Sequence, residues 1–474
     1  MDFPLFHLDW AGNRMLIAVI AVLHVLVNHF MAVGAMPLIA LVQWWGYRTA
    51  DPRWDRLAYR LLGVCFIVTT TVGALTGVGI WLSASLVNPH AIGSLIRVFF
   101  WAWFTEWIVF ITEVCLILAY FLTWKSWGER RKGQHIVFGC ALALASWLTM
   151  AIIVAILGFM MDPGSWAERR SFWTGVLNPI YLPQLCFRTP LAMVMAGLLA
   201  LLLIPFFTAR DAFRRRALRF VGVWTLAWSA PCIVGAGFYW LAIPDAMRSN
   251  MPVALATQAF QTWHTAVAQI LTVAAAAILI ISLWAVIKPG WLPRPATAVP
   301  FLLMFVLLGY FERVREFVRK PAVIENYMYA NGIEIDKYPL LREEGVLAHA
   351  TYASHRTVTP ENELEAGRDM FIIACSRCHT TTGVNGVVNK LTTMYGREPW
   401  SREIVLTNIR TLHNVRPFMP PAPGTDAELS ALAAYLVSLQ ANPVPVGGAQ
   451  NEGVKTPVTT QPAVTLRPTA LGEG

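Results

Sequence analysis

Eight long apolar runs constrain the fold of this chain more than any other feature of its sequence. An α-helix needs about 20 apolar residues to cross the hydrocarbon core of a bilayer. Only 14% of the residues are charged and 56% are hydrophobic, which excludes a soluble protein of this length. We therefore expect an all-α, polytopic membrane bundle of about eight helices. The runs lie near residues 15–43, 61–84, 98–122, 136–160, 181–207, 218–243, 261–287 and 298–318.

The basic residues indicate how the bundle is oriented in the membrane. They gather in alternate connectors, near residues 48–60, 125–132, 210–219 and 288–294. By the positive-inside rule these connectors are cytoplasmic. The N-terminus and everything beyond about residue 320 are then expected on the periplasmic side of a bacterial inner membrane. Because the net charge of +9 sits in these short clusters, it sets the topology, and we expect no nucleic-acid binding.

A covalent heme site is predicted near the C-terminus. Cys375-Ser-Arg-Cys378-His379 is a C-x-x-C-H motif, in which two thioethers fix one heme c and the histidine binds its iron. Met419, in the Pro-rich segment RPFMPPAPGT, is the expected second axial ligand, with His413 as the alternative. A zinc half-site is disfavoured because the other five cysteines all lie in apolar runs. The surrounding segment resembles class I cytochrome c domains.

These patterns divide the chain into four parts. Residues 1–320 form the transmembrane bundle and residues 321–360 a connector. Residues 361–441 form a small all-α cytochrome c domain. Residues 442–474 are rich in Pro, Gly and Thr and are expected to be a disordered tail.

Ionisable residues inside the apolar runs are candidate cofactor ligands, because each buried charge costs at least ~2.5 kcal/mol in a membrane. Odd-numbered runs begin outside, so most of these residues converge on the half of the membrane next to the cytochrome domain. One isolated histidine is more often a satisfied core residue, but a set at one depth favours heme ligation. The candidates are His24, His29, Glu106, Glu113, Arg188, His264, Glu312, Arg315, Glu316 and Arg319.

Several of these segments resemble subunit I of cytochrome bd quinol oxidases, over about residues 10–325. They are RMLIAVIAVLHVLVNHFMAVGAM, GALTGVGIW, LNPIYLPQLCFRT and EFVRKPAVI. The resemblance implies one or two b-type hemes in the bundle, with a d-type heme as a further option.

The resemblance also implies ligands for the bundle heme. His24 is preferred to His29 as an iron ligand because its distance from Arg14 matches the family's spacing. Glu316 is the second implied ligand, with Arg319 as a propionate partner. One of Glu106 and Glu113 serves the same heme, and Glu113 is also a candidate proton relay.

The chain departs from that family at two sites. In the fifth span, Arg188 stands where the family has the histidine ligand of its low-spin heme. In the seventh span, Ala266 stands where the family has the methionine that binds the same heme, and His264 stands where the family usually has an arginine. That heme is therefore either lost or held by His264 with Arg188 on a propionate. The outer segment IPDAMRSNMPVALATQ is also too short for the family's quinol-binding loop, which leaves quinone binding open.

Three functions are compatible with these features. The first is a terminal oxidase subunit in which a periplasmic electron-transfer protein and the fused cytochrome c replace quinol. The second is a relay or anchor subunit of a larger respiratory complex without oxygen reduction. The third is a tethered cytochrome c, which leaves the buried ionisable set unexplained. By resemblance we also expect a second integral membrane subunit.

Overall fold

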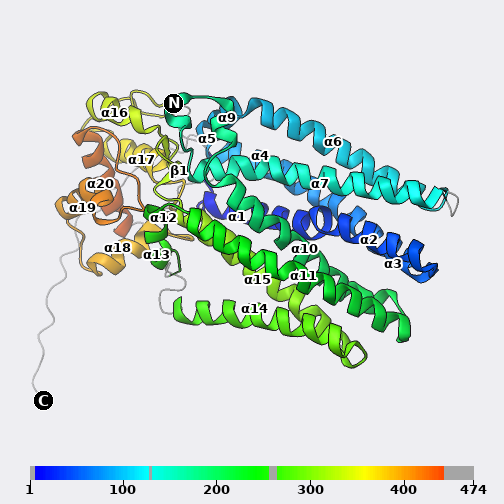
Figure 1. The fold of residues 1–474 in the computed structure, drawn as a ribbon. Coiled ribbons are helices and arrows are strands. Elements are labelled where there is room, and N and C mark those ends of the chain that lie inside the picture. Colours follow the sequence, from blue (N-terminus) through cyan, green and yellow to red (C-terminus); the bar gives the residue numbers. More distant parts are fainter. Residues whose placement is uncertain (1–5, 128–130, 256–263, 442–474) are drawn as a thin grey trace, which may run out of the picture.

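The computed structural model describes residues 6–127, 131–255 and 264–441, without the side chains of residues 264–268. The expected tail, residues 442–474, lies outside this range. Almost all regular structure in the described chain is helical, which confirms the predicted all-α class. Figure 1 shows long helices running side by side, with the cytochrome c domain at one end of them.

Eight helical segments are long and apolar enough to cross a membrane, as predicted. The first two each contain an internal π-helical segment. The first consists of α1 (Asn13–Val27), η1 (Asn28–Val33) and α2 (Ala35–Thr49). The second consists of α3 (Pro52–Val68), η2 (Thr69–Gly73) and α4 (Ala74–Val87). The others are α6 (Phe100–Thr123), α7 (Lys132–Met161), α10 (Tyr181–Phe207), α11 (Ala212–Ala242), α14 (His264–Ile287) and α15 (Arg294–Val318).

Helix α10 forms the centre of the bundle. It contacts α11, α15, α7 and η1, and 78% of its most apolar window is buried within the protein. Small residues permit this packing, because a Cβ added at Gly197 would lie only 2.1 Å from Thr225 Oγ1 of α11. Without a strong hydrophobic force between helices in lipid, such close contacts supply much of the association energy.

Short elements cover the end of the bundle that carries the cytochrome domain (Figure 1). A buried cluster of Phe99, Phe159, Trp166, Ile324 and Met328 joins several of them to α7. The elements are α5 (Pro89–Val98), α8 (Trp166–Arg169), α9 (Phe172–Val176), α12 (Asp245–Ser249), α13 (Met251–Leu255) and the antiparallel pair β1 (Ala322–Ile324) and β2 (Met328–Tyr329). The turns that hold the basic connectors lie at the opposite end, including η5 (Pro289–Trp291).

The cytochrome domain is built around two crossing helices. A Cβ added at Gly367 would lie 2.1 Å from the Ala431 carbonyl oxygen, so only glycine allows this close crossing of α17 and α20. Part of the connector belongs to the same core, since Glu428 accepts the backbone N–H groups of Val346 (2.9 Å) and Leu347 (2.8 Å). The helices are η6 (Ile335–Lys337), α16 (Tyr338–Glu344), α17 (Glu363–Ala374), α18 (Val387–Tyr395), α19 (Arg402–Val415) and α20 (Asp426–Ala441).

Candidate functional site

The C-x-x-C-H motif forms a tight turn directly after α17. The backbone N–H groups of Cys378 and His379 both donate to the Cys375 carbonyl, at 3.1 and 3.0 Å. The turn therefore keeps two thiols and one imidazole within a few residues of the end of a rigid helix. Both thiols are free and half-buried, as required for thioether formation with a heme.

His379 is prepared for iron binding through its other ring nitrogen. Its Nδ1–H donates to the Asn385 carbonyl at 3.1 Å, and Asn385 in turn donates to the Cys378 carbonyl at 2.5 Å. Burial, assisted by the charge of Lys390, lowers the pKa of His379 to about 4. The ring is neutral at physiological pH, so Nε2 keeps the lone pair that iron needs. These residues fit a heme c.

Met419 lies in a loop that is held by backbone contacts. Its N–H donates to the Arg416 carbonyl at 2.8 Å, and His413 Nδ1 donates to the Met419 carbonyl at 2.6 Å. His413 thus positions the methionine loop through one nitrogen. The half-buried Met419 side chain is suited to a thioether ligand, which favours ferrous iron.

The heme c motif contacts one end of the bundle directly, and this end is called the outer end below. Arg377 Nε donates to the Val87 carbonyl of α4 at 3.1 Å. Lys320, just beyond α15, places its Nζ 3.3 Å from Cys378 Sγ. Burial and the charge of Arg14 lower the pKa of Lys320, whereas Cys378 and Glu316 favour its charged form.

An N-terminal segment, residues 6–12, fixes the loop that follows His379. Buried Asp9 accepts from both the N–H and the hydroxyl of Thr381, each at 2.9 Å. The Val384 N–H donates to the Trp10 carbonyl at 3.2 Å. A Cβ added at Gly383 would lie 2.2 Å from the Asp9 carbonyl oxygen, so this contact depends on glycine.

An aromatic pair also joins the cytochrome domain to α15. The ring centroids of Phe317 and Phe418 are 5.7 Å apart. Phe317 directly follows Glu316, and Phe418 directly precedes Met419. The helix that carries Glu316 and the loop that carries Met419 therefore touch through neighbouring side chains.

His24 lies near the end of α1, which contacts the π-helical segment η2. Its Nδ1 is 3.2 Å from the Gly73 carbonyl of η2, to which it donates, and Asn28 donates to its Nε2 at 2.7 Å. A Cβ added at Gly77 would lie 3.2 Å from the His24 ring, so glycine leaves space for the imidazole. Single π turns in membrane helices are frequent at functional sites.

His29 belongs to a buried charge network. Arg188, which is 1% exposed, lies 2.7 Å from Glu312 and 3.4 Å from His29 Nε2. Arg315 forms a second ion pair with Glu312 at 2.8 Å. Two cations thus share one carboxylate in the outer half of the bundle.

Glu316 lies one helical turn further out on α15. It pairs with Arg319 at 2.6 Å, yet its side chain is 41% exposed, so protein atoms do not cover the whole carboxylate. Because helices rise about 1.5 Å per residue, Glu316 lies about 6 Å outward of Glu312 and His24 about 7.5 Å outward of His29. The Arg188 network links His29 to Glu312, so His24 and Glu316 lie at comparable depths.

Glu106 and Glu113 lie on one face of α6, two turns apart. Ser146 and Thr149 of α7 donate to the Glu113 carboxylate at 2.6 and 3.2 Å. Both glutamates are half-buried. Helix α14 begins at His264, whose side chain lies outside the described residues.

The described side chains contain no cluster of three His, Cys, Asp or Glu that could hold a metal ion. A heme iron needs only one or two protein ligands, so single histidines and carboxylates are the relevant candidates.

Sequence analysis missed the residues that connect the two domains, including Lys320, Asp9 and Phe317. They carry no motif of their own. The only sequence feature that could have indicated Lys320 and Phe317 is their position within two residues of Arg319, which was already a candidate heme contact.

Comparisons with known proteins agree with this arrangement. Residues 13–241 match the family model "Cytochrome bd terminal oxidase subunit I", and residues 362–436 match "Cytochrome C oxidase, cbb3-type, subunit III". A solved structure, "The structure of bd oxidase from Geobacillus thermodenitrificans", is similar with a TM-score of 0.56 and 15% identity. The match covers 68% of this chain and 90% of that chain. No curated protein matches the chain. The protein is therefore a membrane-bound electron-transfer hemoprotein in which a cytochrome bd subunit I-like bundle is joined to a cytochrome c domain.

Proposed function

We propose that the chain passes electrons between the heme c on Cys375 and Cys378 and a b-type heme in the outer half of the bundle, and onward to oxygen. The observation that carries this proposal is that the candidate bundle site lies at the end of α15 that the cytochrome domain contacts. Glu316 and Arg319 lie on its outer end, and Phe317 and Lys320 of the same segment contact the cytochrome domain.

We assign His24 and Glu316 as the iron-binding residues of the bundle. His24 donates from Nδ1 to Gly73, which leaves the Nε2 lone pair for a ligand once Asn28 moves aside. His29 is less suited because the Arg188 guanidinium lies against its Nε2 and would repel a metal cation. A heme held there would supply reversible one-electron chemistry, and oxygen would bind where one of the two side chains leaves the iron.

Cations near Glu316 suit heme propionates. Arg319 pairs with Glu316, and the charges of Arg14, Arg315 and Lys320 also act on that carboxylate. Guanidinium groups bind carboxylates in a bidentate manner. We therefore assign Arg319, with Arg14, to the propionates of the bundle heme.

We propose a single heme in the bundle. The Arg188 network lies at the fifth span, where resemblance implied a second heme, and its carboxylate is occupied by two cations. The alternative with His264 as a ligand requires these ion pairs to open.

Glu113 is proposed to hold a proton that oxygen reduction consumes. Ser146 and Thr149 orient its carboxyl group toward α7, and Glu106 continues the same face outward. A carboxyl group in a membrane span can exist in protonated form, so this pair can accept and release protons.

The electron donor is proposed to be a periplasmic electron-transfer protein. Asn250, in the short outer segment between the sixth and seventh spans, donates to the carbonyls of Val318 and Lys320 at 3.2 and 2.8 Å. This contact ties the described part of the segment to the end of α15. We also expect a second integral membrane subunit.

Heme analysis of the purified protein together with oxygen uptake tests the proposal. His24→Ala should remove the b-type absorbance and leave the c-type absorbance intact. The matched control is His135→Ala, because His135 is a buried histidine of α7 that bonds to Gln43 and to the Tyr120 carbonyl. Equal b-type absorbance in both variants would reject His24 as a ligand.

A relay function without oxygen reduction is the second candidate. It is favoured by the Arg188 network, because a bundle with one heme has fewer redox centres for multi-electron chemistry. If the purified protein contains heme b but takes up no oxygen when a reduced donor is added, the relay function is the correct one.

A further inference from the structure

The inner end of α11 concentrates positive charge that its own neighbours do not neutralise. Arg215 and Arg219 are four residues apart, and Arg216 and Arg219 are three apart. Like charges at these spacings repel each other on a helix surface. Lys288, directly after α14, adds a fourth cation to the same pocket.

Carboxylates offset little of this charge. Arg216 pairs with Asp51 at 3.1 Å, but Asp51 is also bonded to a second arginine. Within the described part of the chain, no ion pair joins Arg215, Arg219 or Lys288 to a carboxylate.

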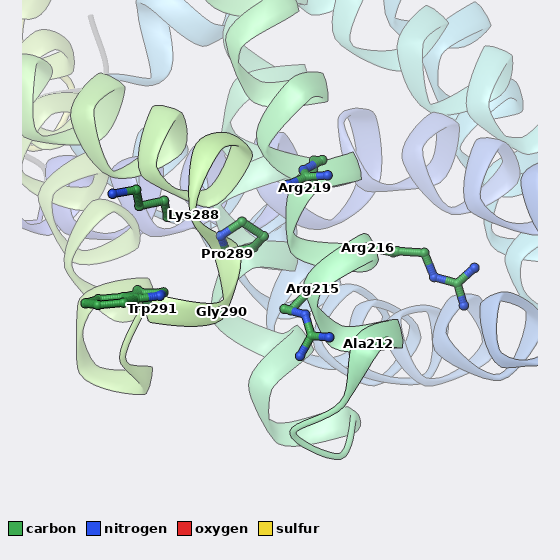
Figure 2. Close-up of a pocket in the computed structure, with 8 residues that line it drawn as sticks. All are labelled: Ala212, Arg215, Arg216, Arg219, Lys288, Pro289, Gly290 and Trp291. Carbon is green, nitrogen blue, oxygen red and sulfur yellow. The ribbon is translucent and has the colours of Figure 1, made fainter.

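The four cations surround an open pocket with a volume of about 680 Å³. Figure 2 shows Arg215 and Arg219 on α11 near η5, where Trp291 lies beside Lys288, whereas the Arg216 side chain extends away from this junction. Trp291 is 80% exposed. An exposed tryptophan beside basic residues at the end of a membrane helix is typical of the bilayer interface.

Apolar surface continues from the pocket into the membrane. Val223 is one turn along α11 from Arg219 and is 52% exposed. Leu283 and Ile287, on the last turns of α14, are 47% and 59% exposed. A molecule bound here would meet cations at one end and hydrocarbon along the rest of its length.

We propose that this pocket binds the headgroup of an anionic phospholipid, with its acyl chains along α11 and α14. Charge complementarity calls for phosphate, and the adjoining apolar surface favours a lipid over a soluble phosphate compound. Basic pockets between membrane helices bind anionic lipid headgroups in this manner. The inference is independent of the hemes, so its failure would leave the proposed function untouched.

Titration of the purified full-length protein in detergent with fluorescent cardiolipin tests the proposal. Arg215→Gln combined with Arg219→Gln should weaken binding by at least tenfold, because each cation near an anionic lipid contributes about fivefold. Lys288→Gln alone should weaken it by about fivefold. The matched control, Arg48→Gln with Arg56→Gln, removes two exposed cations on the same side of the membrane but outside the pocket.

Four further outcomes decide the question. Phosphatidylcholine should fail to displace cardiolipin, and phosphatidylglycerol should displace it. Displacement by inorganic phosphate at equal concentration would show a site for free anions and overturn the lipid assignment. Equal weakening in the control pair would attribute binding to general surface charge, which would also overturn it. An unchanged c-type spectrum and a monodisperse elution profile establish that each variant is folded.

Discussion

Lys320 places a buried cation against the edge of the heme c site, 3.3 Å from Cys378 Sγ. A positive charge near the iron disfavours the ferric state and raises the reduction potential. We expect Lys320→Met to lower the midpoint potential of heme c by roughly 59 mV, a tenfold change for a one-electron couple. A spectroelectrochemical titration of the c-type absorbance measures it.

Two variants separate charge from packing at this position. Lys320→Arg should keep the potential close to that of the unmodified protein. Lys337→Met removes a half-exposed lysine of the same connector that pairs with Glu334 at 3.0 Å, and should have no effect. An unchanged potential in Lys320→Met would assign Lys320 a purely structural role.

The Arg188 network is expected to contribute strongly to stability. Arg188→Met removes one of the two cations that neutralise buried Glu312, and breaking a buried pair costs about 3 kcal/mol or more. The free energy of unfolding in detergent should fall accordingly. Adding Glu312→Gln should lower it further, because Arg315 then loses its carboxylate partner as well.

An exposed ion pair supplies the comparison for this experiment. Arg410→Met breaks a 2.7 Å pair with Asp426, whose side chain is 82% exposed, and should cost less than about 1 kcal/mol. Equal losses for Arg188→Met and Arg410→Met would contradict the role given to the buried network.

Among the structural elements, the N-terminal segment 6–12 is expected to hold the heme loop against the bundle. Gly383→Ala places a Cβ 2.2 Å from the Asp9 carbonyl oxygen, so the two segments must separate. Separation leaves the Asp9 carboxylate without its Thr381 partner, at a cost of about 1–3 kcal/mol. Hydrogen–deuterium exchange should increase in residues 6–12 and 380–386.

Gly133→Ala is a suitable control for that exchange measurement. An added Cβ at Gly133 meets nothing within 4 Å, so exchange in both segments should stay unchanged. Protection that persists in Gly383→Ala would show that the segment is held by other contacts.

The elements that could be predicted are those marked by a pattern within one short stretch of the sequence. Eight apolar runs became eight candidate spans, and C-x-x-C-H fell directly after a helix as expected. Contacts between distant segments could not be predicted, because Asp9 and Thr381 are 372 residues apart and neither carries a motif. The ion pair of Arg188 with Glu312 was missed for the same reason, although both residues had been singled out as buried charges.

At the scale of the whole molecule, the cytochrome domain is docked on the bundle by several independent contacts. They come from the N-terminal segment, the end of α4 and the end of α15. Electron transfer between heme c and the heme proposed for the bundle should therefore need no domain motion. Its rate, measured after flash photolysis, should stay constant as sucrose raises the solvent viscosity.

A swinging domain would give the opposite result. The rate would then fall as viscosity rises, and the contacts of Asp9, Arg377 and Lys320 would represent one of several arrangements. The variant Gly383→Ala, which loosens the docking, is expected to introduce some viscosity dependence and so provides a positive control.

The π-helical segment Asn28–Val33 rotates the side chains that precede it in the first span relative to those that follow it. The part of the span before this segment turns His24 toward Gly73, whereas the part after it packs Met36 and Ile39 into the core. Deleting one residue there would restore ordinary α geometry and rotate one part by about 100° relative to the other. The direction of His24 and the core packing of this span thus depend on a single additional residue. An uninterrupted helix would have to satisfy both requirements with one spacing of side chains.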